Sequence, residues 1–492
     1  MNRLSNLSVP FRLLLVLVLI SLLGLSARPH AAGQELDLAQ RALEAGAYSQ
    51  AALHLELAAG RMPAWASRPL SSTDVLALPG IQELAGHYAL LGGDSQAAIC
   101  NLLLAPQDSL TAQGLTDLGD AYQQVGNWDA AGQSWQKAAL LTGPSLTLSS
   151  RLLQAHRQLG DFPAAIADLQ TLVDLQPGDA SLRYQLGLLT ATQTPEVALA
   201  SLRRAVEMDP TLKAPADSLR HSVEDSQITG DRAYTLLAAG RTLASLNEWD
   251  LAGEAFRQAT LARPDYAEAW AYLGEARQHV QPGAPLPVDD GLPEIRKALA
   301  LDPRSVSANL FLSLYWQRQN KYDLALQTLQ AAADQEPLNP AIQAGRGDIL
   351  AARGDLEPAL EAYQQALSAA HGEFTYLAQL INFSLTYGYQ VRQVALPAAR
   401  QAVIASPHDP AALDLMAQVL IHLNDQASAR RFLDQALQSG PGYARAHLHL
   451  GLVYLFQGNN SQAYQELQLA RNLAEEPPVA DQSQRLLKTY FP

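Results

Sequence analysis

One alanine-centred pattern recurs along this chain at intervals of 34 residues. The spacing is found in three pairs: Ala131 and Ala165, Ala325 and Ala359, Ala429 and Ala463. The fullest copy contains Leu115, Leu118, Gly119, Tyr122, Gly126, Trp128, Ala131, Trp135, Ala138, Gly143 and Pro144. Self-similarity at this period is typical of helical hairpins that stack on one another, so the pattern predicts an all-α chain.

The residues of this pattern resemble the tetratricopeptide repeat, whose signature is a large apolar residue, Leu, Gly and Tyr, followed by Ala, an aromatic residue, Ala and Pro. Other copies contain Leu236, Gly240, Leu243, Asn247, Trp249, Ala252, Phe256, Ala259 and Pro264, and Leu450, Gly451, Tyr454, Gly458, Ala463, Leu467 and Ala470. About eight copies lie in register and cover most of the chain. The resemblance implies an α-solenoid, a right-handed superhelix of about twelve hairpins with no β-sheet.

Several copies place a glycine in the middle of the first helix, where glycine costs roughly 1 kcal/mol relative to alanine. These glycines are Gly119, Gly187, Gly240, Gly274, Gly347 and Gly451. Such a cost indicates that a partner helix comes too close for a side chain. We therefore predict that alanines of the second helix, such as Ala131 and Ala252, face the glycines and allow the two backbones to approach.

A residue suited to left-handed backbone geometry separates the two helices of a copy. These residues are Gly126, Gly160, Asn247, Asn320, Gly354, Asn424 and Gly458. Prolines such as Pro177, Pro264 and Pro337 follow the second helix, because proline lacks a backbone donor and clashes with the preceding turn. No run alternates between apolar and polar residues as a strand would.

The register also predicts how the chain is divided. The predicted segments are a first hairpin at 34–62, a linker at 63–80, an array at 81–210, an extra helix within 211–230, a second array at 231–476 and a capping helix at 477–492. The extra helix, at 214–228, is inferred from a spacing of 54 residues between Ala198 and Ala252. Two further irregularities are a proline-rich loop at 279–290 and a degenerate hairpin near 387–397.

Residues 1–33 have the character of a targeting segment. Arg3 and Arg12 precede an uncharged apolar run at 13–25, and small residues follow it. The run is shorter than the roughly 20 residues that span a bilayer, which favours a cleaved signal peptide. The small residues form only imperfect cleavage sites, so an uncleaved anchor that contacts the membrane through residues 13–27 stays open. In either case the arginines predict repeats outside the cytoplasmic membrane, on a secreted, periplasmic or anchored chain.

Charge and motif content exclude several function classes. The formal net charge of −14 opposes binding to a phosphate backbone, so no nucleic-acid partner is expected. No phosphate loop, nucleophile elbow, zinc spacing or dinucleotide fingerprint is present, so we expect no catalytic residue, metal or cofactor. His447 and His449 form the only close histidine pair, and at i, i+2 on a helix they point apart. The single cysteine, Cys100, excludes an internal disulfide, and we interpret it as a small buried residue of a second helix.

In proteins of the family that this chain resembles, the first helices of successive repeats line a concave groove that holds a partner peptide. Applied here, that arrangement places the partner-binding candidates on the first helices of the middle repeats. They are Tyr184, Leu188, Tyr234, Leu237, Arg241, Tyr272, Leu310, Phe311, Leu314 and Arg318. Exposed aromatic and arginine side chains suit partner anchoring, and packing against the neighbouring repeat is the competing interpretation for each of them.

These observations predict a non-catalytic scaffold that binds protein or peptide partners on the concave face of the solenoid, outside the cytoplasmic membrane. One alternative is an envelope-assembly factor that organises secretion or polysaccharide export. A second is an accessory subunit of a separate enzyme, such as a glycosyltransferase. The specialised carboxylate-gripping version of the family is disfavoured, because its lysine and asparagine positions are occupied here by residues such as Thr116, Asp120 and Asp348.

Overall fold

A computed structural model describes residues 33–61, 80–105, 110–279, 291–474 and 477–491. Within these ranges the regular structure is helical and no strand occurs, as the all-α prediction requires. The predicted targeting segment at 1–33, the linker at 63–80 and the loop at 279–290 lie outside the described residues except at their ends. The chain forms two compact units, one of Met1–Pro264 with Ala276–Asp290 and the other of Asp265–Glu275 with Gly291–Pro492, so α14 (Ala267–His279) is divided between them.

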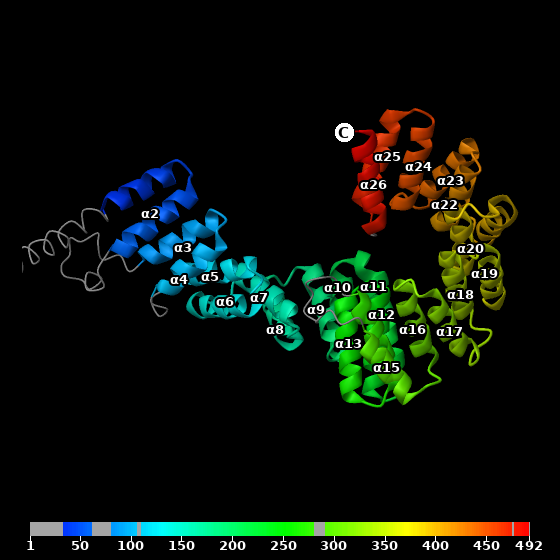
Figure 1. The fold of residues 1–492 in the computed structure, drawn as a ribbon, viewed down its shortest axis with the longest axis horizontal. Coiled ribbons are helices and arrows are strands. Elements are labelled where there is room, and N and C mark those ends of the chain that lie inside the picture. The colour runs from blue at the N-terminus through cyan, green and yellow to red at the C-terminus, as the bar shows by residue number, and fades with distance from the viewer. Residues whose placement is uncertain (1–32, 62–79, 106–109, 280–290, 475–476, 492) are drawn as a thin grey trace, which may run out of the picture. The chain divides into compact units, whose positions relative to one another are not determined.

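The first unit is a series of antiparallel hairpins with one unpaired helix (Figure 1). In chain order its helices are one at residues 33–44, α2 (Tyr48–Arg61), α3 (Ile81–Leu91), α4 (Ser95–Leu104), α5 (Ala112–Gln124), α6 (Trp128–Thr142), α7 (Leu146–Leu159), α8 (Phe162–Leu175), α9 (Ala180–Ala191), α10 (Pro195–Met208), the 3-10 turn η3 (Pro210–Leu212), α11 (Lys213–Gln227), α12 (Arg232–Ser245) and α13 (Trp249–Ala262). The unpaired helix is α11, which occupies the segment where an extra helix is predicted.

The second unit continues the same construction. Beyond α14 its helices are α15 (Leu292–Leu301), α16 (Val306–Arg318), α17 (Tyr322–Ala333), α18 (Pro340–Arg353), α19 (Leu356–Ala369), α20 (Phe374–Thr386), the π-helical turn η4 (Val391–Ala395), α21 (Leu396–Ala405), α22 (Pro410–His422), α23 (Gln426–Ser439), α24 (Ala444–Phe456), α25 (Asn460–Leu473) and α26 (Pro477–Tyr490). The described residues of the two units contain twelve hairpins together with the single helices α11 and α26.

Local sequence explains where the helices begin and end. Asn127 and Asp161 precede α6 and α8, and their side chains accept hydrogen bonds from the backbone N–H groups of Ala130 and Ala164 at 3.2 and 3.1 Å. The seven residues predicted to adopt left-handed geometry all have positive φ, between 57° and 97°. The turn prediction is therefore confirmed.

The mid-helix glycines lie against large side chains of the second helix. A Cβ atom on Gly119 would lie 2.3 Å from Nε1 of the fully buried Trp135, and one on Gly240 would lie 2.5 Å from the ring of Phe256. The prediction of close helix approach is confirmed. A Cβ atom on Gly451 would lie 3.5 Å from the carbonyl oxygen of Ala463, as predicted, but at Gly119 and Gly240 the nearest atoms belong to rings that stand four residues after Ala131 and Ala252. The glycine makes room for a ring, and the alanine is buried one helical turn earlier.

The irregular segments have distinct local structures. Near residue 390 the second helix of a hairpin begins with η4, and Gln390 before it has a φ of 48°. At the C-terminus, Val479 and Leu487 of α26 pack on Leu467 and Ala470 of α25. The helix α26 thus covers apolar surface that the last hairpin would otherwise expose.

Two further observations concern single features of the sequence. Cys100 lies on the second helix α4, but its side chain is exposed, so the interpretation as a buried residue is wrong. No helix among the described residues is both long enough and apolar enough to cross a bilayer. The apolar run at 13–25 lies outside the described residues.

Candidate partner-binding surface

The first helices of successive hairpins lie next to one another, and we call their shared face the first-helix layer. In the first unit, α3 contacts α5, and in the second unit α22 contacts α24. The predicted partner-binding residues lie on the helices of this layer.

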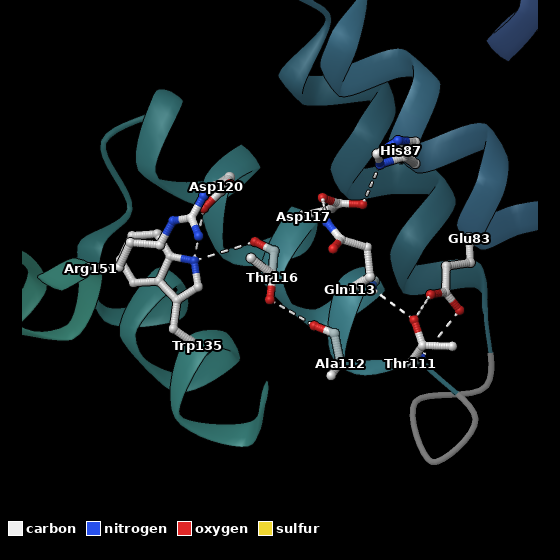
Figure 2. Close-up of polar contacts among 11 residues, drawn as sticks. Glu83, His87, Thr111, Ala112, Gln113, Thr116, Asp117, Asp120, Trp135 and Arg151 are labelled. Carbon is white, nitrogen blue, oxygen red and sulfur yellow. Dashed lines mark hydrogen bonds and ion pairs between the residues drawn. The ribbon is translucent and has the colours of Figure 1, made fainter. Parts of the chain in front are cut away.

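Polar side chains connect neighbouring helices of this layer (Figure 2). Nδ1 of His87 on α3 lies 2.7 Å from Oδ2 of Asp117 on α5, and Gln113 donates to the other oxygen of Asp117 at 2.8 Å. Asp117 is only 4% exposed, so its carboxylate is satisfied within the protein. The contact joins two hairpins.

A second link follows one turn later on α5. Asp120 accepts hydrogen bonds from Nε1 of Trp135 at 3.0 Å and from Nη2 of Arg151 on α7 at 2.5 Å (Figure 2). Burial raises the pKa of Asp120, while Arg151 and the indole N–H favour the charged form. In the second unit Arg318 on α16 pairs with Glu275 on α14. These pairs hold adjacent hairpins in register.

A pocket opens where the first helices α7 and α9 meet the second helices α8 and α13. Its volume is about 220 Å³. The lining residues are Leu153 and Arg157 of α7, Leu169 of α8, Gln185, Leu188 and Leu189 of α9, Glu248, which precedes α13, and Leu251 of α13. Five leucines and three polar or charged residues thus line the pocket.

The pocket depends on the extra helix α11. Because α11 is unpaired and packs between α10 and α12, both helices of the next hairpin, α12 and α13, contact α9. At this contact Gln193 donates to the buried carboxylate of Glu254 at 2.6 Å, and Arg232 donates to the carbonyl oxygen of Gln193 at 3.2 Å. The N-terminal end of the second helix α13 therefore covers part of a surface that the first helices α7 and α9 alone would leave open.

The charged groups at the pocket influence one another. Burial is the main cause of a raised pKa for Glu248, Asp250 adds to it by repulsion, and Arg157 opposes it. Burial and the nearby Glu248 also raise the pKa of Tyr184. The pocket thus contains a carboxyl group, that of Glu248, whose pKa is raised by burial and lowered by Arg157.

The ten predicted partner-binding residues differ in exposure. Arg241, Arg318 and Tyr234 are exposed, the last by 40%, while Tyr184, Tyr272, Leu310 and Leu314 are half-buried. Leu188 is buried in the pocket wall. Leu237 and Phe311 are 1% and 9% exposed, which favours the competing interpretation, packing against a neighbouring helix, for these two.

The reason for their burial is tertiary contact with a neighbouring helix. Phe311 packs edge-on against Tyr272 with a centroid distance of 4.9 Å, inside a cluster that includes Ile295 and Ala308. Conversely, the residues predicted from the sequence do not include three that line the pocket: Arg157, Glu248 and Leu251. The 54-residue spacing pointed to the right region, but it does not show which helix folds onto α9.

Comparisons with known proteins agree with this architecture. The description "Tetratricopeptide repeat-like domain" matches residues 243–386, and "Tetratricopeptide repeat" matches 116–180, 150–213, 392–444 and 416–477. A curated relative, the BBSome complex member BBS4 homolog of Drosophila melanogaster, is 26% identical over 241 residues, which are 49% of this chain and 45% of that protein. The chain thus spans less than half of the length of that relative.

Solved structures with similar folds have low sequence identity. Yeast Tom70 is 14% identical, with 77% of this chain and 95% of that chain covered and a TM-score of 0.36. A tetratricopeptide repeat protein from Parabacteroides merdae is 13% identical, with 55% and 100% covered and a TM-score of 0.39. Since the two family descriptions together match more than half of its residues, the chain belongs to the tetratricopeptide repeat family.

Proposed function

We propose that this protein is a non-catalytic scaffold that binds a protein or peptide partner on its first-helix layer. The observation that carries the proposal is the pocket between α7, α9 and α13, where Arg157 and Glu248 stand beside leucine side chains. A peptide could place an apolar side chain in this pocket and a polar group against its charged edge. Membership of the repeat family supports a role in protein interaction.

We further propose that the repeats act outside the cytoplasmic membrane. The support is the sequence of residues 1–33, with arginines before an apolar run and small residues after it. Protease added to intact cells or spheroplasts should degrade the repeats. Protection of the repeats together with an unprocessed N-terminus would contradict the proposal.

Photo-crosslinking tests the binding surface directly. A photoreactive phenylalanine analogue replaces either Gln185, which lines the pocket, or Gln136, an exposed residue of the second helix α6. Irradiation in the native cells should give a discrete crosslinked product from position 185 and none from position 136. Equal products from both positions, or a product only from position 136, would place binding elsewhere.

The absence of catalysis has its own test. A purified mature chain should turn over none of the substrates of the partner complex that is isolated with it. Turnover that a single point substitution abolishes would show the opposite.

A further inference from the structure

Three repeats have an acidic residue immediately after the mid-helix glycine of the first helix. These residues are Asp120, Glu275 and Asp348. Arg151 on the next first helix pairs with Asp120 at 2.5 Å, and Arg318 on the next first helix pairs with Glu275 at 2.5 Å. Asp348 on α18 differs, because it forms no ion pair with any residue that the structure describes.

Asp120 and Asp348 occupy equivalent places in their repeats. Trp135 and Tyr363 each stand 15 residues after the aspartate, on the second helix of the same hairpin. Nε1 of Trp135 donates to Oδ1 of Asp120 at 3.0 Å, and the hydroxyl of Tyr363 donates to Oδ1 of Asp348 at 2.5 Å. Burial and the nearby Asp348 raise the pKa of Tyr363, so its hydroxyl stays protonated and remains a donor. Each aspartate therefore has one oxygen held by an aromatic side chain of its own hairpin.

The two repeats differ in the residue that the next hairpin supplies. Arg151 follows Asp120 by 31 residues and donates to its second oxygen, Oδ2 (Figure 2). Gln379 on α20 stands at the same interval from Asp348. Within the described part of the chain, the amide of Gln379 makes no hydrogen bond to Asp348. Because glutamine is neutral, it also leaves the charge of Asp348 without compensation.

The surroundings of Asp348 favour a cation that arrives from solvent. The side chain of Asp348 is exposed, whereas that of Asp120 is half-buried. Burial by the surrounding protein nevertheless raises the pKa of Asp348, the hydroxyl of Tyr363 opposes this shift, and no basic side chain contributes. At Asp120 burial also raises the pKa, but Arg151 opposes the shift. A carboxylate that is partly removed from water and lacks a counter-charge is stabilised by a cation that donates hydrogen bonds to it.

We propose that Asp348 binds the guanidinium group of an arginine in a partner protein or peptide, as Asp120 binds that of Arg151. This inference rests on the proposed scaffold function and specifies a basic side chain in the segment that the first-helix layer binds. The guanidinium donates to Oδ2 of Asp348 while Tyr363 keeps Oδ1, which is the arrangement that the chain itself forms at Asp120. The formal net charge of −14 also favours a basic partner segment.

Carboxyl NMR of the purified full chain tests the site with N-acetyl-arginine methylamide as the probe. The signal of Asp348, identified by its absence from Asp348→Asn, should shift saturably with a dissociation constant on the order of 1–10 mM. N-acetyl-citrulline methylamide has nearly the same shape but no charge, so it should bind at least about tenfold more weakly.

A second variant fills the site from within the chain. Gln379→Arg places an arginine at the position equivalent to Arg151, so the signal of Asp348 should no longer respond to the probe and the melting temperature should rise. The double variant Asp348→Asn/Gln379→Arg should lose this rise. Gln364→Arg, at an exposed glutamine of the second helix α19, adds the same charge away from the site. It is the matched control and should leave binding of the probe unchanged.

Three outcomes would overturn this assignment of Asp348. They are a signal that does not respond to the arginine probe, equal binding of the arginine and citrulline probes, and unchanged binding of the arginine probe by Gln379→Arg. The photo-crosslink at position 185 reports the scaffold function separately. A crosslinked product without a response at Asp348 would defeat this inference alone, and a response at Asp348 without the product would defeat the binding surface proposed above.

Discussion

Arg157 and Asp250 stand 93 residues apart in the chain, and Nη2 of the arginine lies 2.6 Å from Oδ2 of the aspartate. The pair connects α7 to α13 across two hairpin boundaries and the unpaired helix α11. It lies at the edge of the pocket that contains Glu248, so the break in the repeat register and the candidate surface are one structural feature.

Removal of this ion pair should have a small effect on stability and a larger one on the pocket. Both side chains are partly exposed, so Arg157→Ala should lower the free energy of unfolding by only about 0.5–1 kcal/mol in urea denaturation. Because Arg157 opposes the raised pKa of Glu248, the variant should raise that pKa further, as carboxyl NMR would record. Arg204→Ala, in an exposed pair with Glu207, is the control and should leave the pKa unchanged.

Stability should depend on pH through His156. Its hydrogen bond to Asp168 is the main cause of its raised pKa, and burial opposes that shift. A raised pKa in the folded state means that the stabilisation is complete below the unfolded value near 6.5 and is lost as pH rises through the folded pKa. The melting temperature of the wild type should therefore fall over that window relative to His156→Gln. Parallel profiles for the two proteins would contradict this assignment.

Two glycine substitutions should act in opposite directions. Gly119→Ala places a methyl group 2.3 Å from the indole of Trp135 and should destabilise the chain by about 1–3 kcal/mol. Gly132→Ala, in the middle of α6, meets only the methyl group of Ala155 at 3.5 Å and should be neutral or stabilising by up to about 1 kcal/mol. Thermal unfolding followed by circular dichroism measures both. A similar loss in the two variants would show that helix geometry, and not the contact with Trp135, sets the cost.

Tyr234 and Phe311 should separate binding from folding. Phe311→Ala removes a buried ring that packs on Tyr272 and should cost about 3 kcal/mol of stability. Tyr234→Ala removes a side chain that is 40% exposed and should change stability by less than about 1 kcal/mol, while it weakens capture of the partner. Full partner capture by Tyr234→Ala would exclude this residue from the surface.

The sequence alone was sufficient for the elements that depend on near neighbours in the chain. The 34-residue spacing, the left-handed residues such as Asn247 and Gly354, and the prolines after second helices predict the hairpins and their ends. Helix periodicity and capping act over a few residues, so their signals are local. The same reasoning located α11 from a change in spacing.

Only the tertiary structure decided which side chains these helices expose. Cys100 was interpreted as buried and is exposed, and the choice between exposure and packing stayed open for Phe311, because the repeat pattern does not specify how a given neighbour packs. The pocket beside Glu248 arises between helices, where one inserted helix changes which residues come into contact. Contacts between residues distant in the chain follow from how hairpins stack, so the sequence determined the repeat and the packing determined its sites.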